Sequence, residues 1–485
     1  MIVNRFDKIY YALIGAIDLL ILVLYSYSTS FIYDKPALGD AAIFMTIGKA
    51  WANGFEPYID LWDSKGPIIF LVNGIGYWLF GNKCGVLLVQ YVCLLISAIA
   101  MYKLLRIGFE RNVSLLFLFF VLLSFASLGI GCNTVAEYVL PLLSTAYYRF
   151  YMWSKDVEKG GIVEHRITDA MLYGIIVSFC AFSRLTNCIG VCLLVAFVTI
   201  WLIKERRWSN LLCNILFFFI GVLIVALPIC SYFIWRGTFE DMWFATFEYN
   251  LDYAKTSSSY LFSLTGILKS MIIYSEIWIL AVVSIVVLVF SKTRKQFGAL
   301  WMLISGFTIL YLIRSNGYAH YGIISLPLLC VSLLEIKVVY EESSIMQLRW
   351  MKNAICVIYM SIVVAYNIHS ARVFVNNYLD NEELNRYDSF LSDIPEDYKN
   401  SFIAYNPSPH IYFYMNIMPK YRFFVFQDFG ANINEKYNEM LKQTYSKCTA
   451  EWILVENSDY AIKDVLHSGY EIYKKDQGMI LYRRK

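Results

Sequence analysis

The chain has 485 residues, of which 58% are hydrophobic and 16% are charged, and its formal net charge is +3. Because soluble domains carry about a quarter charged residues, this composition excludes a disordered chain, a nucleic-acid-binding protein and an ordinary soluble enzyme. The mean hydropathy is +0.52, and the apolar residues are gathered in long runs, which predicts a polytopic membrane protein.

Eleven apolar runs are long enough to predict transmembrane helices. The first run follows Arg5 and Lys8 and has no small-residue cleavage site, so we expect a retained anchor and not a signal peptide. The predicted spans are 10–32, 85–102, 113–131, 134–152, 170–185, 187–203, 211–235, 271–291, 297–313, 319–336 and 353–371.

A twelfth apolar run, 67–81, is predicted not to cross the membrane. Six stretches rich in Lys and Arg flank the spans, and the positive-inside rule places such stretches in the cytoplasm. All six fall on that side only if 67–81 lies along the outer surface as a juxtamembrane helix. We therefore expect a multi-pass protein of the cell membrane with a cytoplasmic N-terminus and an extracytoplasmic tail.

The sequence predicts two domains. Residues 1–372 form an all-α transmembrane domain with its first external loop at 33–84, and residues 373–485 form a small extracytoplasmic α/β domain. In this tail, short apolar runs (402–406, 421–428 and 451–457) alternate with helix-like segments (434–447 and 459–469), and a hairpin near 470–484 closes the sheet.

The most informative stretch runs from Gly39 to Pro67. Asp40 precedes a short amphipathic helix that we expect to lie in the membrane interface, and the simplest role for Asp40 is that of its N-cap. Asp60, Asp63 and Lys65 follow, either as a solvated, charge-balanced loop or as an ordered site. The loop is rich in Trp, Tyr, Pro and Gly and lies between two membrane-associated helices, which favours the ordered site.

Further polar side chains are expected on the same side of the membrane, at the outer ends of spans. These are Glu137, Arg184, His320 and Tyr321. Structural alternatives exist for most of them: Arg184 could snorkel, Tyr58 and Tyr321 could belong to the aromatic belt, and His320 could begin a helix without binding anything.

Chemistry on the outer face must use a donor delivered in the membrane, because nucleotide-activated sugars are cytoplasmic. A sugar on a polyprenyl phosphate fits this requirement. Its transfer needs a carboxylate as general base, for which Asp40 is the candidate, and cations for the departing phosphate, for which Lys65, Arg184 and His320 are candidates. Aromatic faces for the sugar could come from Trp51, Tyr58 and Trp62.

The first external loop resembles that of the GT-C glycosyltransferases, in the protein-mannosyltransferase-like and aminoarabinose-transferase-like group (family 39/83 type). The residues that carry the resemblance are Gly39-Asp40, Pro57-Tyr58-x-Asp60, Asp63-x-Lys65-Gly66-Pro67 and Asn73-Gly74-x-Gly76. Weaker signals are the Arg184-x-Thr186-Asn187 turn, the His320-Tyr321 element and an external C-terminal domain.

The resemblance implies a GT-C fold with two juxtamembrane helices and an inverting transfer from a polyprenyl-phosphate sugar. By position, Asp40 matches the catalytic carboxylate of the family and Lys65 matches a basic residue that contacts the donor phosphate. The acidic residue expected beside this lysine is Ser64 here, with Asp63 one step further away. A divalent metal ion is therefore left open, and no cofactor is assigned.

Taken together, the sequence predicts an inverting membrane glycosyltransferase that moves a sugar from a polyprenyl phosphate to a hydroxyl of a lipid, polysaccharide or protein. The remaining candidates for substrate contacts are Asp60, Asp63, Glu137 and Tyr321. Two alternatives stay open: a flippase or secondary transporter, although neither the broken helices nor the repeated halves typical of transporters are detected, and a catalytically inactive scaffold.

Overall fold

The computed structural model describes residues 5–33, 39–129, 131–160, 164–256, 295–314, 318–342, 382–399, 401–457, 462–476 and 478–485, with four isolated positions between 357 and 365. The chain divides into two compact units. Unit 1 comprises Met1–Ser26, Leu88–Ile229 and Tyr260–Phe374, and unit 2 comprises Tyr27–Leu87, Cys230–Ser259 and Val375–Lys485. The domain boundary predicted at 372 and 373 falls outside the described residues and stays a prediction.

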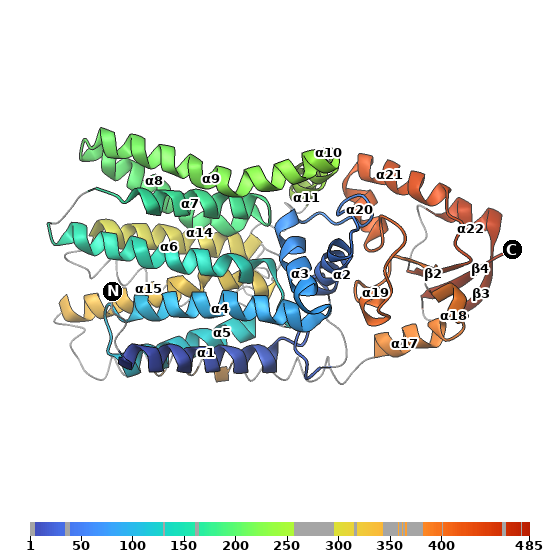
Figure 1. Cartoon of the computed structure of the whole chain (residues 1–485), viewed down its shortest axis with the longest axis horizontal. Coiled ribbons are helices and arrows are strands. Elements are labelled where there is room, and N and C mark those ends of the chain that lie inside the picture. Colours follow the sequence, from blue (N-terminus) through green and yellow to red (C-terminus); the bar gives the residue numbers. More distant parts are fainter. Residues whose placement is uncertain are drawn as a thin grey trace. The chain divides into compact units, whose positions relative to one another are not determined.

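Unit 1 is helical throughout its described part, and Figure 1 shows its long helices side by side with roughly parallel axes. Apolar side chains dominate these helices, so burying them against one another or against lipid is what favours the bundle. The elements are α1 (Arg5–Tyr25), most of α4 (Lys83–Leu105), α5 (Arg111–Leu128), α6 (Val135–Glu158), α7 (Ile167–Ala181), η1 (Leu185–Cys188), α8 (Ile189–Lys204), most of α9 (Trp208–Arg236), α14 (Lys295–Arg314), η4 (Ala319–Ser325) and α15 (Leu326–Glu342).

Six segments of the described chain are long and apolar enough to cross a bilayer, which confirms a multi-pass membrane protein. They are Asp7–Tyr25, Lys83–Leu105, Arg111–Leu128, Leu185–Lys204, Trp208–Arg236 and Ala319–Glu341. The predicted spans at 170–185 and 297–313 correspond to shorter apolar helices, and that at 134–152 corresponds to the less apolar α6.

Two of the eleven predicted spans, 271–291 and nearly all of 353–371, lie outside the described residues. The expected number of spans therefore stays a prediction. The first predicted span, 10–32, was too long, because α1 ends at Tyr25 and residues 27–29 form a turn. Ser and Thr residues at 26 and 28–30 explain this end, since their hydroxyls favour turns over helix interiors.

In unit 2, the two predicted juxtamembrane helices are present as α2 (Asp40–Ala52) and α3 (Pro67–Phe80). The 14 residues of α3 extend for about 21 Å, which is shorter than the roughly 30 Å hydrocarbon core of a bilayer. Because α7 has only 15 residues as well, length alone does not separate the two, and the position of 67–81 along the outer surface stays a prediction.

Glycines allow these helices to approach each other closely. A Cβ atom added at Gly48 of α2 would lie 2.5 Å from the Cβ of Asn73 in α3. One turn later, a Cβ at Gly76 would lie 2.6 Å from the backbone nitrogen of Val86, in the first turn of α4. The Asn73-Gly74-x-Gly76 motif thus serves the packing of α3 against both of its neighbours.

The remainder of unit 2 contains short helices and one mixed sheet. Among the described residues, three helical segments follow α9, and six further short helices surround the strands. They are α10 (Phe239–Trp243), the π-helical turn η2 (Phe244–Glu248), α11 (Tyr249–Thr256), α17 (Glu382–Leu391), α18 (Glu396–Lys399), α19 (Ile411–Tyr414), α20 (Gln427–Ile433), α21 (Glu435–Ser446) and α22 (Lys463–Gly469).

The sheet has the order β1-β2-β4-β3. Strand β1 (Ile403–Tyr405) pairs in parallel with β2 (Trp452–Glu456), and the hairpin of β3 (Tyr470–Asp476) and β4 (Met479–Arg484) adds two antiparallel pairings. This confirms the small C-terminal sheet and its closing hairpin. The apolar run 421–428, however, is an irregular segment that leads into α20.

Candidate functional site

Asp40 is the first residue of α2 and not its cap. The N-cap is Gly39, with φ 66°, and no side-chain capping bond is formed there. The Asp40 side chain is 42% exposed, and a negative charge in the first turn is favourable beside the positive end of the helix dipole. The capping role that the sequence favoured is therefore wrong, and Asp40 is an accessible carboxylate.

Lys65 lies between two carboxylates. Its Nζ is 3.9 Å from Asp40 Oδ2 and 3.9 Å from Asp63 Oδ1. The lysine side chain is 23% exposed and that of Asp63 only 10%. The structure thus brings together three of the residues predicted from the sequence, in what we call the Asp40–Lys65–Asp63 cluster.

Burial raises the pKa of the Asp63 carboxyl above its usual value, an effect that the nearby Lys65 ammonium opposes and the Asp40 carboxylate reinforces. Asp63 Oδ1 also accepts a hydrogen bond of 2.9 Å from the backbone N–H of Lys65. Asp63 therefore fixes the backbone at Lys65 as well as contributing charge, whereas Asp40 is the more accessible of the two acids.

Tyr58 holds the loop between α2 and α3 from inside. It is fully buried, and its hydroxyl donates a hydrogen bond of 2.8 Å to the carbonyl of Lys65. Its φ of 70° is unusual for a residue with a side chain; a hydrogen bond of 2.8 Å from its own N–H to Leu61 O and ring contacts with Phe70 and Phe233 hold it there. Tyr58 is thus not part of an exposed aromatic belt.

Asp60 and Trp62 are also engaged within unit 2. Asp60 Oδ2 accepts a hydrogen bond of 2.6 Å from the backbone N–H of Glu56, while the residue stays exposed. Trp62 is buried, and its ring packs against Tyr249, Phe423 and Tyr437. Phe423, from the run 421–428 that was expected to be a strand, thus packs against this loop.

Glu56 was missed from the sequence, although it anchors the same loop. It is buried, and its Oε2 accepts a hydrogen bond of 2.8 Å from Arg236 Nε and another of 3.3 Å from the Tyr232 hydroxyl. The predicted site residue Trp51, half-buried, donates its Nε1–H to the same hydroxyl at 2.9 Å. An acidic residue before a proline gave no signal of a partner 180 positions away.

Unit 1 gathers three other predicted site residues. The Arg184 guanidinium lies over the ring of Tyr321, 3.9 Å from its centroid, and the His320 ring meets Tyr321 edge to face at 4.7 Å. Such a cation–π contact holds the arginine without removing its charge. Arg184 therefore stacks on the Tyr321 ring, and this contact fixes the position of its guanidinium. Snorkelling towards the headgroups would not provide such a contact.

Glu137, the last predicted site residue, lies in the first turn of α6, whose N-cap is Thr134. It completes a capping box with Thr134, and its Oε2 accepts a hydrogen bond of 2.8 Å from the Gln90 side chain. Glu137 is 4% exposed. These contacts account for its presence at the helix start, and a contact with substrate stays a prediction.

The residues of the cluster do not fit a divalent metal ion. The Lys65 ammonium already lies between the two carboxylates, and within the described ranges no group of three or more His, Cys, Asp or Glu side chains is arranged to hold an ion.

Solved structures with a similar fold include ArnT and an archaeal oligosaccharyltransferase. ArnT from Cupriavidus metallidurans, bound to undecaprenyl phosphate, aligns with a TM-score of 0.57 at 12% identity, covering 98% of this chain and 97% of that one. Its apo structure aligns equally well at 10% identity, with the same coverage of both chains. The apo oligosaccharyltransferase of Archaeoglobus fulgidus gives 0.54 at 12% identity, covering 99% of this chain and 75% of that one.

These similarities establish the GT-C fold that the sequence predicted, without establishing a substrate. No curated protein matches the chain. A family model, that of the competence-induced Ccs4 N-terminal domain, matches residues 12–371. The chain therefore belongs to the competence-induced Ccs4 N-terminal domain family, and its fold is that of the GT-C membrane glycosyltransferases.

Proposed function

We propose that this protein transfers a sugar from a polyprenyl-phosphate-linked donor to a hydroxyl group of a lipid, glycan or protein acceptor, with inversion at the anomeric carbon. The observation that carries the proposal is the Asp40–Lys65–Asp63 cluster at the start of a juxtamembrane helix in a GT-C fold. The similar structure of ArnT with undecaprenyl phosphate bound supports a donor of this lipid class.

In the proposed reaction, the Asp40 carboxylate takes the proton of the acceptor hydroxyl as that oxygen attacks the anomeric carbon. The new carbon–oxygen bond forms on the face opposite the phosphate while the bond to the phosphate oxygen breaks, so the configuration inverts. The phosphate leaves with the bonding electron pair. Lys65 supplies a positive charge that stabilises this leaving group.

Asp40 and Asp63 have different tasks in this scheme. A general base must reach the proton that it removes, and the exposed fraction of Asp40 is about four times that of Asp63. Asp63 instead positions Lys65 through its backbone. Arg184 and His320 lie in unit 1, and their assignment to the donor phosphate rests on the sequence alone.

The side of the membrane is part of the proposal. The positive-inside pattern of the loops supports a cytoplasmic N-terminus and an extracytoplasmic position for α2, α3 and the C-terminal sheet. A donor carried on a membrane lipid suits this face, where nucleotide-activated sugars are absent.

The test is a transfer assay with purified protein in nanodiscs and a panel of radiolabelled polyprenyl-phosphate sugars, each offered with membrane glycolipids and glycans as acceptors. We expect one donor to yield free polyprenyl phosphate and a glycoside of inverted configuration. If the protein in liposomes instead moves intact donor across the bilayer and releases no free polyprenyl phosphate, it is a flippase and the proposal is wrong.

A further inference from the structure

We propose that a pocket of about 490 Å³ in unit 2 binds a saccharide, the sugar portion of the acceptor. This inference rests on the proposed transferase function. One wall comes from the loop after α2, with Phe55, Ile59 and Asp60, and the other from the segment before α20, with Met418, Pro419, Lys420 and Arg422. The volume lies within the usual range of roughly 300 to 1,000 Å³ for small-molecule sites.

The two walls are bonded to each other and to unit 2 around them. The backbone N–H of Trp62 donates a hydrogen bond of 2.8 Å to the carbonyl of Arg422. The Arg422 guanidinium in turn donates a hydrogen bond of 2.6 Å to Asp241 Oδ1 in α10. A pocket whose walls are held in this way is preformed, which reduces the ordering cost of binding.

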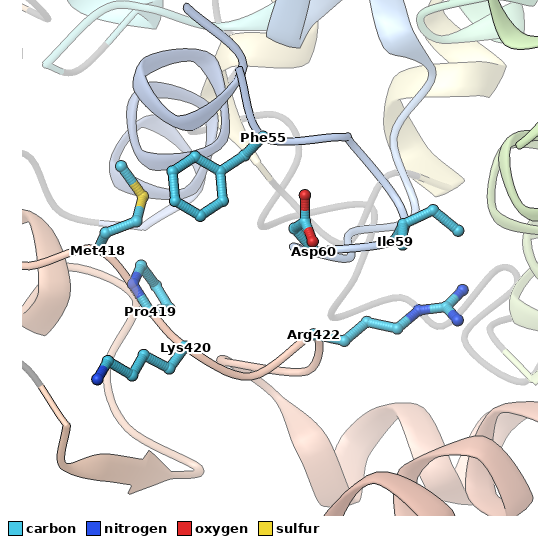
Figure 2. Close-up of a pocket in the computed structure, with 7 residues that line it drawn as sticks. All are labelled: Phe55, Ile59, Asp60, Met418, Pro419, Lys420 and Arg422. Atoms are coloured by element: carbon cyan, nitrogen blue, oxygen red, sulfur yellow. The ribbon is translucent and has the colours of Figure 1, made fainter. Parts of the chain in front are cut away.

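The lining suits a sugar ring, which has apolar C–H faces and a rim of hydroxyls. Figure 2 shows Phe55 and Met418 next to each other at one side of the pocket, and Asp60 between Phe55 and Ile59. The Phe55 side chain is 40% exposed, so its ring is available as an apolar platform. Asp60 uses one carboxylate oxygen for the Glu56 N–H, and the other can accept hydrogen bonds from sugar hydroxyls.

The opposite wall supplies hydrogen-bond donors. Among the described residues, Lys420 has no ion-pair partner, and Arg422 Nε–H has no acceptor although it is buried. Lys420 is thus a lining cation whose charge is not used by an ion pair among the described residues, whereas the Arg422 guanidinium is paired with Asp241. This free positive charge favours a saccharide that carries an acidic group over a neutral one of the same size.

The residues that line one wall of the pocket directly precede residues of the proposed catalytic cluster in the sequence. Asp60 lines the pocket, Trp62 bonds to its far wall, and Asp63 and Lys65 follow directly. The pocket lining and the lysine of the cluster therefore belong to the same loop. This arrangement assigns the pocket to the acceptor and leaves Lys65 to the donor phosphate.

The test measures binding of saccharides alone to the full-length protein in nanodiscs by saturation-transfer difference NMR. The probes are disaccharides of gluco, galacto and manno configuration, each as the neutral sugar and as its uronic acid. We expect at least one pair to bind, with the acid at least threefold tighter than the neutral sugar. Phe55→Ala and Asp60→Asn should each weaken binding at least fivefold, and Lys420→Gln should abolish the preference for the acid.

Lys475→Gln is the matched control, because Lys475 is an exposed lysine on β3 that does not line the pocket. It should bind like the wild-type protein. The inference is overturned if none of the probes binds, or if Phe55→Ala and Asp60→Asn bind as the wild type does. The binding assay contains no donor, so its result does not depend on transfer. If saccharides bind but the transfer assay finds no activity, the transferase proposal is contradicted and the saccharide pocket is not.

Once an acceptor is known, steady-state kinetics can test the pocket independently of the transferase activity. Phe55→Ala should raise KM for the acceptor at least fivefold without a matching rise in KM for the donor lipid. Transfer that proceeds with an unchanged acceptor KM in this variant would support the transferase and contradict the pocket.

Discussion

The ammonium of Lys65 lies 3.9 Å from the carboxylate of Asp40. It therefore faces the proposed base and is close enough to contribute a positive charge to a phosphate that leaves nearby. We predict that Lys65→Gln reduces kcat/KM for the donor by about 10- to 100-fold, in line with the loss of one charged contact in a partly buried site. Steady-state kinetics with varied donor concentration measure this change.

Lys65→Arg is the comparison for that variant. It keeps the charge but replaces a compact ammonium by a planar guanidinium, so we expect activity between those of the wild type and Lys65→Gln. If Lys65→Gln keeps the wild-type kcat/KM, the ammonium has no role in donor binding or departure.

The raised pKa of Asp63 predicts a pH-dependent stability difference. The Asp63 carboxyl has a higher pKa in the folded protein than its ordinary value of 3.8, so the folded state binds the proton more tightly than the unfolded state. This proton binding stabilises the fold fully below pH 3.8. The stabilisation is lost as the pH rises through the pKa of the folded state. Asp63→Asn cannot ionise, and its Oδ1 can still accept the Lys65 N–H. The melting temperature of this variant minus that of the wild type should therefore increase between pH 4 and pH 7.5.

Thermal unfolding of both proteins in the same detergent, followed across that pH range, checks the sign. A difference that stays constant or decreases with pH would show that Asp63 is not held with a raised pKa. Asp60→Asn serves as a reference, because Asp60 is an exposed carboxylate on the same loop.

Glu56 should matter for stability more than any exposed acid of the loop. Its carboxylate is buried and accepts hydrogen bonds from Arg236 and Tyr232. Glu56→Ala leaves the Arg236 charge without its partner, and we expect a loss of about 1 to 3 kcal/mol, less than for a fully buried pair because the arginine is 41% exposed. Denaturation measurements on Glu56→Ala, Arg236→Ala and the double variant determine the coupling.

The expected signature is non-additivity: the double variant should lose less stability than the sum of the two single variants. Strictly additive losses would mean that the two side chains do not act as a pair.

Gly48 is predicted to tolerate no side chain. A Cβ there would lie 2.5 Å from the Asn73 Cβ and 2.8 Å from the Gly74 nitrogen, so Gly48→Ala should force α2 and α3 apart and cost about 1 to 3 kcal/mol. Gly306→Ala is the control, since nothing lies within 4 Å of its added Cβ, and alanine is the better helix former. Thermal melting should show a loss for the first variant and none for the second.

Much of the fold could be predicted from the sequence because its signals are local. The apolar runs indicated most of the described long helices, Pro67 and Gly81 marked the ends of α3, and the alternating pattern near 470–484 indicated the closing hairpin. The run 421–428 had a strand-like composition, yet its Phe423 packs against Trp62, and tertiary contacts of this kind override a local strand preference.

The candidate site was predicted where its residues are neighbours in the sequence. Asp63 and Lys65 share a short loop, and Asp40 begins the helix before it, so the cluster could be anticipated. Glu56 with Arg236, and the pocket walls at Phe55 and Lys420, join segments far apart in the chain. Such pairs leave no local pattern. The N-cap of α2 is Gly39 and not Asp40, one residue before the predicted position. Gly39 has a positive φ, which glycine adopts readily.

The most direct test of the account is the rate of transfer by Asp40→Asn. This substitution keeps the shape of an exposed side chain, so the protein should fold and express, with only a small decrease in melting temperature from the lost charge in the first turn. A general base contributes about 10² to 10⁴ in rate. We therefore predict that release of polyprenyl phosphate falls at least a hundredfold under saturating donor and acceptor. A rate near that of the wild type would contradict the account, because Asp40 would then not be the base.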